Sequence, residues 1–477
     1  MKDLKQLAAL DLYMKEGMYE KDIIFISIIA LSVLTTGCNN TSSEIILYLP
    51  QGFESFISFN QETFVPVKSD MIDNFNTRLK ELKINSKLVV KTYDNKMALD
   101  NKDNFIDLLL ERDSNADIVL FDQTYVDQLM PLDSYYKTQE GKDILSYYSD
   151  EYIDRLKING SLYLVPKIVY PLTKQYVQKK DCINDFDYTN ILNLTDFLNC
   201  IYEKYSVDHN FYISDLAVSQ IVSDKYQHID NSELNPLFLR KSDKKVVNAF
   251  EEQEILNVMR LINKLHQAGF TGKGLSYSEY STMIEKQDSI LEFGDDFIFN
   301  PDKDNRVYMD KEQYCAPGGL SILKKSNQAE EAFKILWAIY TDKECSSCFQ
   351  SPKNQTYFGS FDLLGNNYLI SSTSSQPDNK LDYYMDLEKQ SDVDQSLKYP
   401  LLFDLSKEVD KIEQYEEIVS LNRYFDSSTN KNIFKAEHAF DEVAYEKYLQ
   451  TVREKLKEVG IDKTISNLQE QVDAYGT

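Results

Sequence analysis

The chain has 477 residues, a formal net charge of −25 and 27% charged residues. So acidic a protein is not expected to bind nucleic acid or another phosphate-rich partner, and it favours neutral or cationic ligands. Hydrophobic residues make up 42% of the chain, which is typical of a globular protein. After removal of a leader, about 440 residues remain. A single compact core does not hold so many residues, so two lobes are expected.

An uncharged apolar run lies near the N-terminus, between Ile23 and Thr36. A helix that spans a membrane needs about 20 apolar residues, whereas the apolar region of a secretory signal needs about 7 to 15. Lys15 and Lys21 precede the run, as is usual for a signal peptide. The run therefore predicts export from the cytoplasm.

The run leads into Leu34-Thr35-Thr36-Gly37-Cys38, which resembles a bacterial lipobox. In a lipobox the Cys is lipidated and becomes the new N-terminus. The resemblance implies a signal peptide over 1–37, a lipid anchor at Cys38 and a polar tether over 38–43. It places the protein on the extracytoplasmic face of the cell membrane. An ordinary signal peptide followed by an unrelated Cys is the alternative.

Strands and helices alternate after the tether. Apolar segments predict strands at Glu44–Pro50, 86–94 and Asp117–Phe121, with a helix after Ser69 and another after Phe105. This alternation predicts a parallel sheet, whose ligands bind beyond the carboxyl ends of its strands. Asp122 follows the third strand and is therefore a candidate site residue, with a role as a helix N-cap as the alternative.

A hairpin is predicted at Asn159-Gly160, because both residues of a tight hairpin turn must accept positive φ. Pro166 and Pro171 then flank an extended segment that leads into a new strand.

The order of these segments resembles the family-1 extracellular solute-binding proteins of ABC importers. In that family an Asp-flanked strand, a Pro-Leu-Asp and an Asn-Gly hairpin precede the first crossover between two lobes. Segments further along the chain resemble a strand of the second lobe, the return to the first lobe and the C-terminal helices. The matching segments here are Asp117–Asp122, Pro131–Asp133, Asn159–Pro166, 288–299, 316–344 and 441–476.

The resemblance implies an α/β fold with two lobes and hinge crossovers, the class II periplasmic-binding-protein-like fold. Lobe 1 would comprise 44–165 and about 312–355, and lobe 2 about 166–311 and 356–477. The function implied is capture of a small molecule, a sugar or oligosaccharide by family analogy, for the membrane subunits of an ABC importer. A monomer without a cofactor is expected, and a cationic ligand stays open.

Several polar and aromatic residues are candidates for contact with the ligand. Tyr170 would line the hinge, Tyr314 would lie on a cleft loop, and Asp295 with Asp296 would follow the strand Ser289–Phe293. Each has an ordinary alternative in packing, turn formation or helix capping. The full candidate set is Tyr48, Asp122, Tyr170, Asp295, Tyr314 and Tyr357.

No metal site or catalytic residue is predicted. The four His residues are scattered, and the five Cys beyond Cys38 leave at least one thiol unpaired, with the pairing open: Cys182, Cys200, Cys315, Cys345 and Cys348. Trp337, the only Trp, lies at helical spacing with Phe333 and Tyr340 and is expected in the core.

An enzyme on the same fold is the alternative function. The hairpin segment also resembles that of bacterial thiaminase of the first type, which acts on a cationic heterocycle through a Cys nucleophile and a Glu base. Here Tyr170 aligns with the nucleophile and Asp295 with the base, and Cys315 is the only thiol near the expected cleft. Because a Tyr is a poor replacement for a thiolate, binding without catalysis is the preferred interpretation.

Overall fold

A computed structural model describes most of the chain. For residues 70–71, 173–178, 212, 290–291, 293–297, 306–313 and 421 it describes the backbone alone. The described residues are 43–50, 70–94, 97–98, 101–102, 104–148, 150–166, 173–178, 193–206, 212–213, 217–230, 232, 234–268, 270, 290–291, 293–297, 306–313, 318–342, 344–345, 400–421 and 440–475.

Lobe 1 is built on a five-stranded sheet with the order β2-β1-β3-β13-β4. Its strands are β1 (Glu44–Pro50), β2 (Lys87–Tyr93), β3 (Ala116–Leu120), β4 (Val165–Pro166) and β13 (Gly319–Ile322). Its helices are α4 (Asp70–Glu81), α6 (Phe105–Arg112), α7 (Gln139–Leu145), α8 (Asp150–Arg155) and α13 (Ala329–Thr341), with the short 3-10 helices η1 (Gln123–Gln128) and η2 (Tyr135–Lys137).

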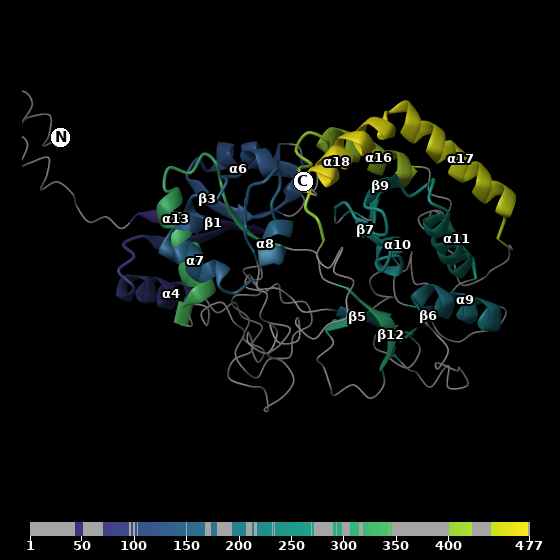
Figure 1. The fold of residues 1–477 in the computed structure, drawn as a ribbon, viewed down its shortest axis with the longest axis horizontal. Helices are drawn as coiled ribbons and strands as arrows, with labels where there is room; N and C mark the ends of the chain where they lie inside the picture. Colours follow the sequence, from purple (N-terminus) through teal and green to yellow (C-terminus); the bar gives the residue numbers. More distant parts are fainter. Residues whose placement is uncertain are drawn as a thin grey trace, which may run out of the picture.

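Both faces of this sheet are covered, so β1 is buried from Ile45 to Leu49. Ile45, Leu47 and Leu49 pack into the core that contains α4 and α13, whereas Ile46 and Tyr48 pack on the opposite face against α6. β1 pairs in parallel with β2 and β3, as the alternation of strands and helices predicts. Figure 1 shows this lobe, with the sheet between its helices.

Asp117 stabilises an irregularity in the middle of the sheet. The register between β1 and β3 shifts between Ile46 and Leu47. There the Asp117 carboxylate accepts hydrogen bonds from the Ile46 N–H at 3.0 Å and from the Ser326 hydroxyl at 2.6 Å. Asp117 is 3% exposed, and desolvation raises the pKa of its carboxyl against the opposing effect of these bonds. It therefore has a structural role.

The return of the chain to lobe 1 has two notable features. β13 runs antiparallel to β3 and β4, and a Cβ on Gly319 would collide with the Val165 carbonyl, so only glycine fits there. The helix that follows, α13, has Gln328 as its N-cap without a side-chain cap, and the Ser326 hydroxyl donates to Asp117 and accepts from the Gln328 N–H at 3.2 Å.

Trp337, which was expected in the core, is partly buried at its edge. Trp337 packs against the hydrophobic core of lobe 1, and its Nε1 donates to Asp143 at 3.2 Å. Cys345 is fully buried in the same core, whereas Cys200 is an exposed free thiol on the second lobe.

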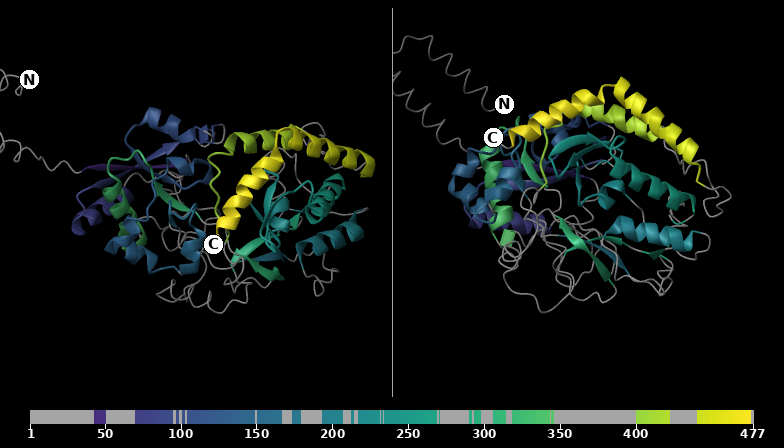
Figure 2. Two further views of the ribbon diagram at one scale, coloured as in Figure 1. Left: turned by 45° about the horizontal axis from the view of Figure 1, so that its top comes forward. Right: turned by 45° about the vertical axis from the view of Figure 1, so that its right-hand side comes forward.

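Lobe 2 has a separate hydrophobic core. Its helices are α9 (Leu194–Tyr205), α10 (Val218–Ile221), α11 (Gln253–Gln267), α16 (Val409–Leu421), α17 (Glu442–Glu458) and α18 (Ile461–Ala474). They pack with the antiparallel sheet of β7 (Tyr226–His228), β8 (Leu237–Arg240) and β9 (Lys245–Asn248). In Figure 2, α17 and α18 extend across this lobe, and the C-terminus lies at the junction with lobe 1.

Two further small sheets belong to the chain. β6 (Tyr212–Ile213) pairs in parallel with β10 (Ile290–Leu291), and β5 (Thr173–Gln178) lies between β11 (Phe293–Phe297) and β12 (Arg306–Gln313). The prediction that Asp295 and Asp296 follow the end of a strand is wrong. They lie within β11, opposite Gln175 and Lys174, because β5 provides an antiparallel partner along this whole segment.

A strap, defined as Leu401–Leu405, connects the two cores. Leu402 packs into the core of lobe 1, whereas Leu401, Phe403 and Leu405 pack into the core of lobe 2. Alternate residues of an extended chain point in opposite directions, which is why one short segment serves both cores. The strap lies at the junction of the two lobes and precedes α16 in the chain.

The predicted hairpin turn docks against this strap. Asn159 and Gly160 have φ of 51° and 79°, and Ile158 pairs with Ser161, so the hairpin turn is confirmed. The Asn159 side chain donates to Asp404 at 3.2 Å, and the Lys157 carbonyl accepts from the Tyr475 hydroxyl. The turn thus links lobe 1 to both the strap and the C-terminal helix.

Candidate functional site

Asp122 lies at the carboxyl end of β3, where η1 begins. Its Oδ1 accepts hydrogen bonds from the Thr124 backbone N–H at 2.9 Å and from the Thr124 hydroxyl at 2.8 Å, which makes it the N-cap of η1. Its Oδ2 has no hydrogen-bond partner among the described residues. One oxygen of the carboxylate therefore fixes the side chain, and the other is available to a ligand.

The surroundings of Asp122 are unusual for a cap. Its side chain is exposed to solvent, yet desolvation by the protein around it raises the pKa of the carboxyl. The hydrogen bonds from Thr124 act in the opposite direction, the negative charge of Asp230 adds to the rise, and Lys102 opposes it. Because Asp122 is exposed at the carboxyl end of β3, a small ligand can reach its carboxylate at the edge of the sheet where ligands of such folds bind.

Aromatic side chains lie beside this carboxylate. The ring of Phe105 is 4.8 Å from that of Tyr93 and 5.8 Å from that of Tyr125, between centroids. Burial and the charge of Asp122 raise the pKa of both Tyr hydroxyls. Tyr125 donates to the Leu120 carbonyl at 2.6 Å, whereas no hydrogen bond of Tyr93 to another described residue is present. Tyr93 can therefore offer a free hydroxyl next to Asp122.

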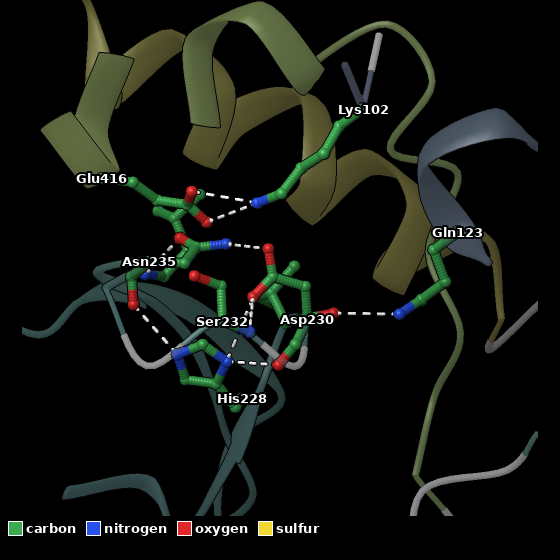
Figure 3. Close-up of polar contacts among 9 residues, drawn as sticks. Lys102, Gln123, His228, Asp230, Ser232, Asn235 and Glu416 are labelled. Atoms are coloured by element: carbon green, nitrogen blue, oxygen red, sulfur yellow. Dashed lines mark hydrogen bonds and ion pairs between the residues drawn. The ribbon is translucent and has the colours of Figure 1, made fainter. Parts of the chain in front are cut away.

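The part of lobe 2 that lies nearest to Asp122 is the loop that follows β7. Gln123, the residue next to Asp122, donates from Nε2 to the Ile229 carbonyl at 3.2 Å. Figure 3 shows Asp230 in the same loop, with its carboxylate accepting from the Ser232 N–H and from Asn235 Nδ2, both at 2.8 Å. Asp230 is thus held rigidly while its charge acts on Asp122 across the lobe junction.

A charged histidine ends β7, directly before this loop. His228 Nε2 lies 2.9 Å from the Asn235 carbonyl oxygen, and Nδ1 faces both the carbonyl and the carboxylate of Asp230. Because carbonyl oxygens only accept, both ring nitrogens must carry protons, so His228 is an imidazolium. Burial acts to lower its pKa, but the bonds and charge of Asp230 outweigh that effect and raise it. The pair is therefore neutral as a unit.

The predicted site residues are distributed as follows. Asp122 belongs to the candidate site just described and is also the N-cap that was considered as the alternative. Tyr48 packs under α6, and its hydroxyl donates to Asp113 at 2.9 Å. The backbone of Asp295 lies in β11, and its side chain is outside the described residues. Cys38, Tyr170, Tyr314, Tyr357 and the thiols Cys182, Cys315 and Cys348 are also outside the described residues.

Sequence reasoning missed Tyr93, Gln123 and Asp230. Tyr93 is the last residue of β2, so the rule that selected Asp122 after β3 could also have selected Tyr93. Nothing local marks Asp230, because it meets the site only through the packing of the two lobes.

Two further searches concern the described part of the chain alone. No cluster of three or more His, Cys, Asp or Glu residues within it could hold a metal ion. Nor does any described helix combine the length and the apolar character that crossing a membrane demands.

Comparison with known proteins identifies the fold. A family model described as a domain of unknown function (DUF3502) matches residues 432–477, which include α17 and α18. No curated protein matches the chain. An N-glycan transport solute-binding protein (NgtS) of Streptococcus pneumoniae superposes with a TM-score of 0.61 at 17% identity, covering 91% of this chain and 99% of its own.

Two ligand complexes superpose over similar lengths. NgtS in complex with Man5GlcNAc has a TM-score of 0.58 at 16% identity and covers 91% of this chain and 98% of its own. The S. pneumoniae ABC-transporter substrate-binding protein FusA in complex with kestose has a TM-score of 0.54 at 12% identity, covering 91% and 99%. The predicted fold is therefore confirmed: the chain has the two-lobed α/β fold of the substrate-binding proteins of ABC transporters.

Proposed function

We propose that this protein is an extracytoplasmic solute-binding protein that captures an oligosaccharide between its lobes for an ABC importer. The observation that carries the proposal is the exposed Asp122 carboxylate at the carboxyl end of β3, where Thr124 fixes one oxygen and the other has no hydrogen-bond partner among the described residues. Support for the ligand class comes from solved proteins of the same fold, whose complexes contain Man5GlcNAc and kestose.

The chemistry of the site suits a sugar. Asp122 accepts hydrogen bonds from vicinal hydroxyl groups, and the Tyr93 hydroxyl supplies a donor or an acceptor beside it. Of the three aromatic rings at this place, Phe105 and Tyr93 are buried, so the half-buried Tyr125 is the ring proposed to contact the apolar face of a pyranose or furanose. A ligand that contacts Asp122 on lobe 1 and the loop after β7 on lobe 2 stabilises the arrangement in which both surfaces face each other.

The remaining site residues are part of this proposal. Tyr170 and Tyr314 would reach the ligand from crossover segments, Tyr357 from a rim loop, and Asp295 from the small sheet around β5. Tyr48 would contribute at the sheet edge only if its hydroxyl left Asp113. The lobe boundaries that go with them are 44–165 plus about 312–355, and about 166–311 plus 356–477.

We also propose that a lipid on Cys38 anchors the mature protein to the outer face of the membrane. The uncharged apolar run that ends in Thr-Gly-Cys supports this proposal. Replacement of Cys38 by Ala should release the protein into the medium or leave the precursor unprocessed. A Cys38→Ala protein that is processed normally and stays with the membrane would rule out the anchor.

The protein is expected to release its ligand unchanged. A binding protein needs complementarity to the ground state of the ligand, whereas an enzyme needs it to a transition state. Incubation with thiamine and an aniline co-substrate should give no product. Multiple turnovers, detected by chromatography of the products, would show that the protein is an enzyme. Their loss in Cys315→Ala would identify the nucleophile.

The direct test is a thermal unfolding screen of the mature protein with oligomannose, fructo- and malto-oligosaccharides, with polyamines and thiamine as cationic probes. A ligand at 100 times its Kd stabilises the native state by about 2.7 kcal/mol, which a melting curve detects easily. We expect one class of oligosaccharide to raise Tm. Stabilisation by polyamines or thiamine alone would contradict the proposed ligand class.

A further inference from the structure

An ion pair joins the two lobes close to the candidate site. Lys102, which precedes α6 in lobe 1, donates from Nζ to both carboxylate oxygens of Glu416 on α16 of lobe 2, at 3.1 and 2.9 Å (Figure 3). The Lys102 side chain is 22% exposed and that of Glu416 is 15% exposed. Because its two members belong to different cores, the pair persists only while the lobes keep their present arrangement.

The place of this pair connects it to the ligand site. The positive charge of Lys102 is close enough to Asp122 to act on its carboxyl, yet the hydrogen bonds of Lys102 go to Glu416. The ammonium group of Lys102 is therefore engaged by Glu416, and it makes no hydrogen bond to Asp122. If the lobes separated, Glu416 would move away with lobe 2. Lys102 would remain on lobe 1, where its charge acts on Asp122.

We propose that Lys102 and Glu416 form an electrostatic latch that favours the present lobe arrangement and thereby raises ligand affinity without touching the ligand. An interaction that exists in one of two states shifts their equilibrium by its own free energy. Partial burial makes the pair less sensitive to screening than an ion pair in free solution. The latch rests on the two-lobed fold and on movement between the lobes, and not on the identity of the ligand.

The experiment measures the lobe arrangement directly, without ligand. Fluorescent dyes on unnatural amino acids at exposed positions 137 of lobe 1 and 447 of lobe 2 report the distance between the lobes in single molecules. Glu416→Gln and Lys102→Met should each lower the ratio of the present arrangement to more open ones roughly two- to fivefold. The double variant should lower it no further, because both substitutions remove one interaction.

A matched control comes from an ion pair within lobe 2. Lys225 and Glu254 are 2.8 Å apart, so Lys225→Met removes a similar Lys–Glu contact without affecting the junction. That variant should keep the wild-type ratio. Raising the salt to 1 M, where the Debye length is about 3 Å, should move the wild type only part of the way towards the Glu416→Gln value, because the pair is partly buried, and should leave Glu416→Gln itself unchanged.

Two results would overturn the latch. One is a Glu416→Gln protein whose lobe ratio equals that of the wild type. The other is a shift in Lys102→Met that Glu416→Gln does not reproduce, because Lys102 would then act through Asp122 alone. Failure of the proposed function has a different signature: the ratio would shift as expected while no oligosaccharide binds in calorimetry.

Discussion

The side-chain oxygen of Gln123 accepts a hydrogen bond from the backbone N–H of Phe403 at 2.5 Å, across 280 positions of sequence. Gln123 also accepts from Leu405 through its own carbonyl, at 3.1 Å, and donates to Ile229. One residue of lobe 1 thus holds the strap and the lobe 2 loop together, directly beside Asp122. The geometry of the candidate site therefore depends on contacts between the lobes.

Removal of this side chain should destabilise the junction. In Gln123→Ala the N–H of Phe403 loses its partner, which costs about 1–3 kcal/mol when the group stays desolvated. Urea unfolding should show this loss in the free energy of unfolding. Gln128→Ala, in the same 3-10 helix, is the control, because its side chain makes no hydrogen bond to other described residues. Equal stability of the two variants would contradict the role of Gln123.

The charged state of His228 predicts a specific dependence on pH. Its folded pKa is raised above the ordinary 6.5, so the stability it contributes is complete below about pH 6.5 and is lost as pH rises through the folded pKa. The difference in unfolding free energy between wild type and His228→Asn should shrink as pH is raised from 6 to 9. A difference that grows with pH would show that His228 is neutral in the native protein.

Substitutions of Tyr48 and Tyr93 distinguish a structural role of a tyrosine hydroxyl from a role in ligand binding. The Tyr48 hydroxyl is bonded to Asp113, and burial together with that carboxylate raises the pKa of Tyr48 to about 12. Tyr48→Phe should therefore cost about 1 kcal/mol of stability and leave ligand affinity unchanged. Tyr93→Phe should do the opposite, with little effect on unfolding and a several-fold loss of affinity. Calorimetry and urea unfolding on both variants decide between these outcomes, and a reversed pattern would place Tyr48 in the site.

The sequence predicts those parts of the protein that depend on local patterns. Alternating apolar segments give β1, β2 and β3 with the helices between them, and Asn159-Gly160 gives the hairpin turn. The choice of Asp122 as a site residue follows from the general rule that ligands bind at the carboxyl ends of parallel strands. These features depend on neighbours within a few positions, or on a rule that applies to every fold of this class.

Contacts between distant segments could not be predicted in the same way. The strap, the loop after β7 and Glu416 reach the site only because two separate cores pack together. Asp295 shows the same limit within a sheet: its segment was placed at the end of a strand, and the antiparallel partner β5 makes it part of one. Strand pairing over long separations is decided by the whole fold and leaves little trace in a short motif.

The central claim is that Asp122 binds an oligosaccharide between the lobes, and isothermal calorimetry on Asp122→Ala tests it most directly. Loss of a polar partner that the bound ligand covers should weaken binding of the oligosaccharide found in the screen by about 1–3 kcal/mol, which is roughly five- to 150-fold in Kd. Asp127→Ala, an exposed position of the same 3-10 helix, is the matched control and should bind as the wild type does. An Asp122→Ala protein that folds normally and keeps the wild-type Kd would contradict the account.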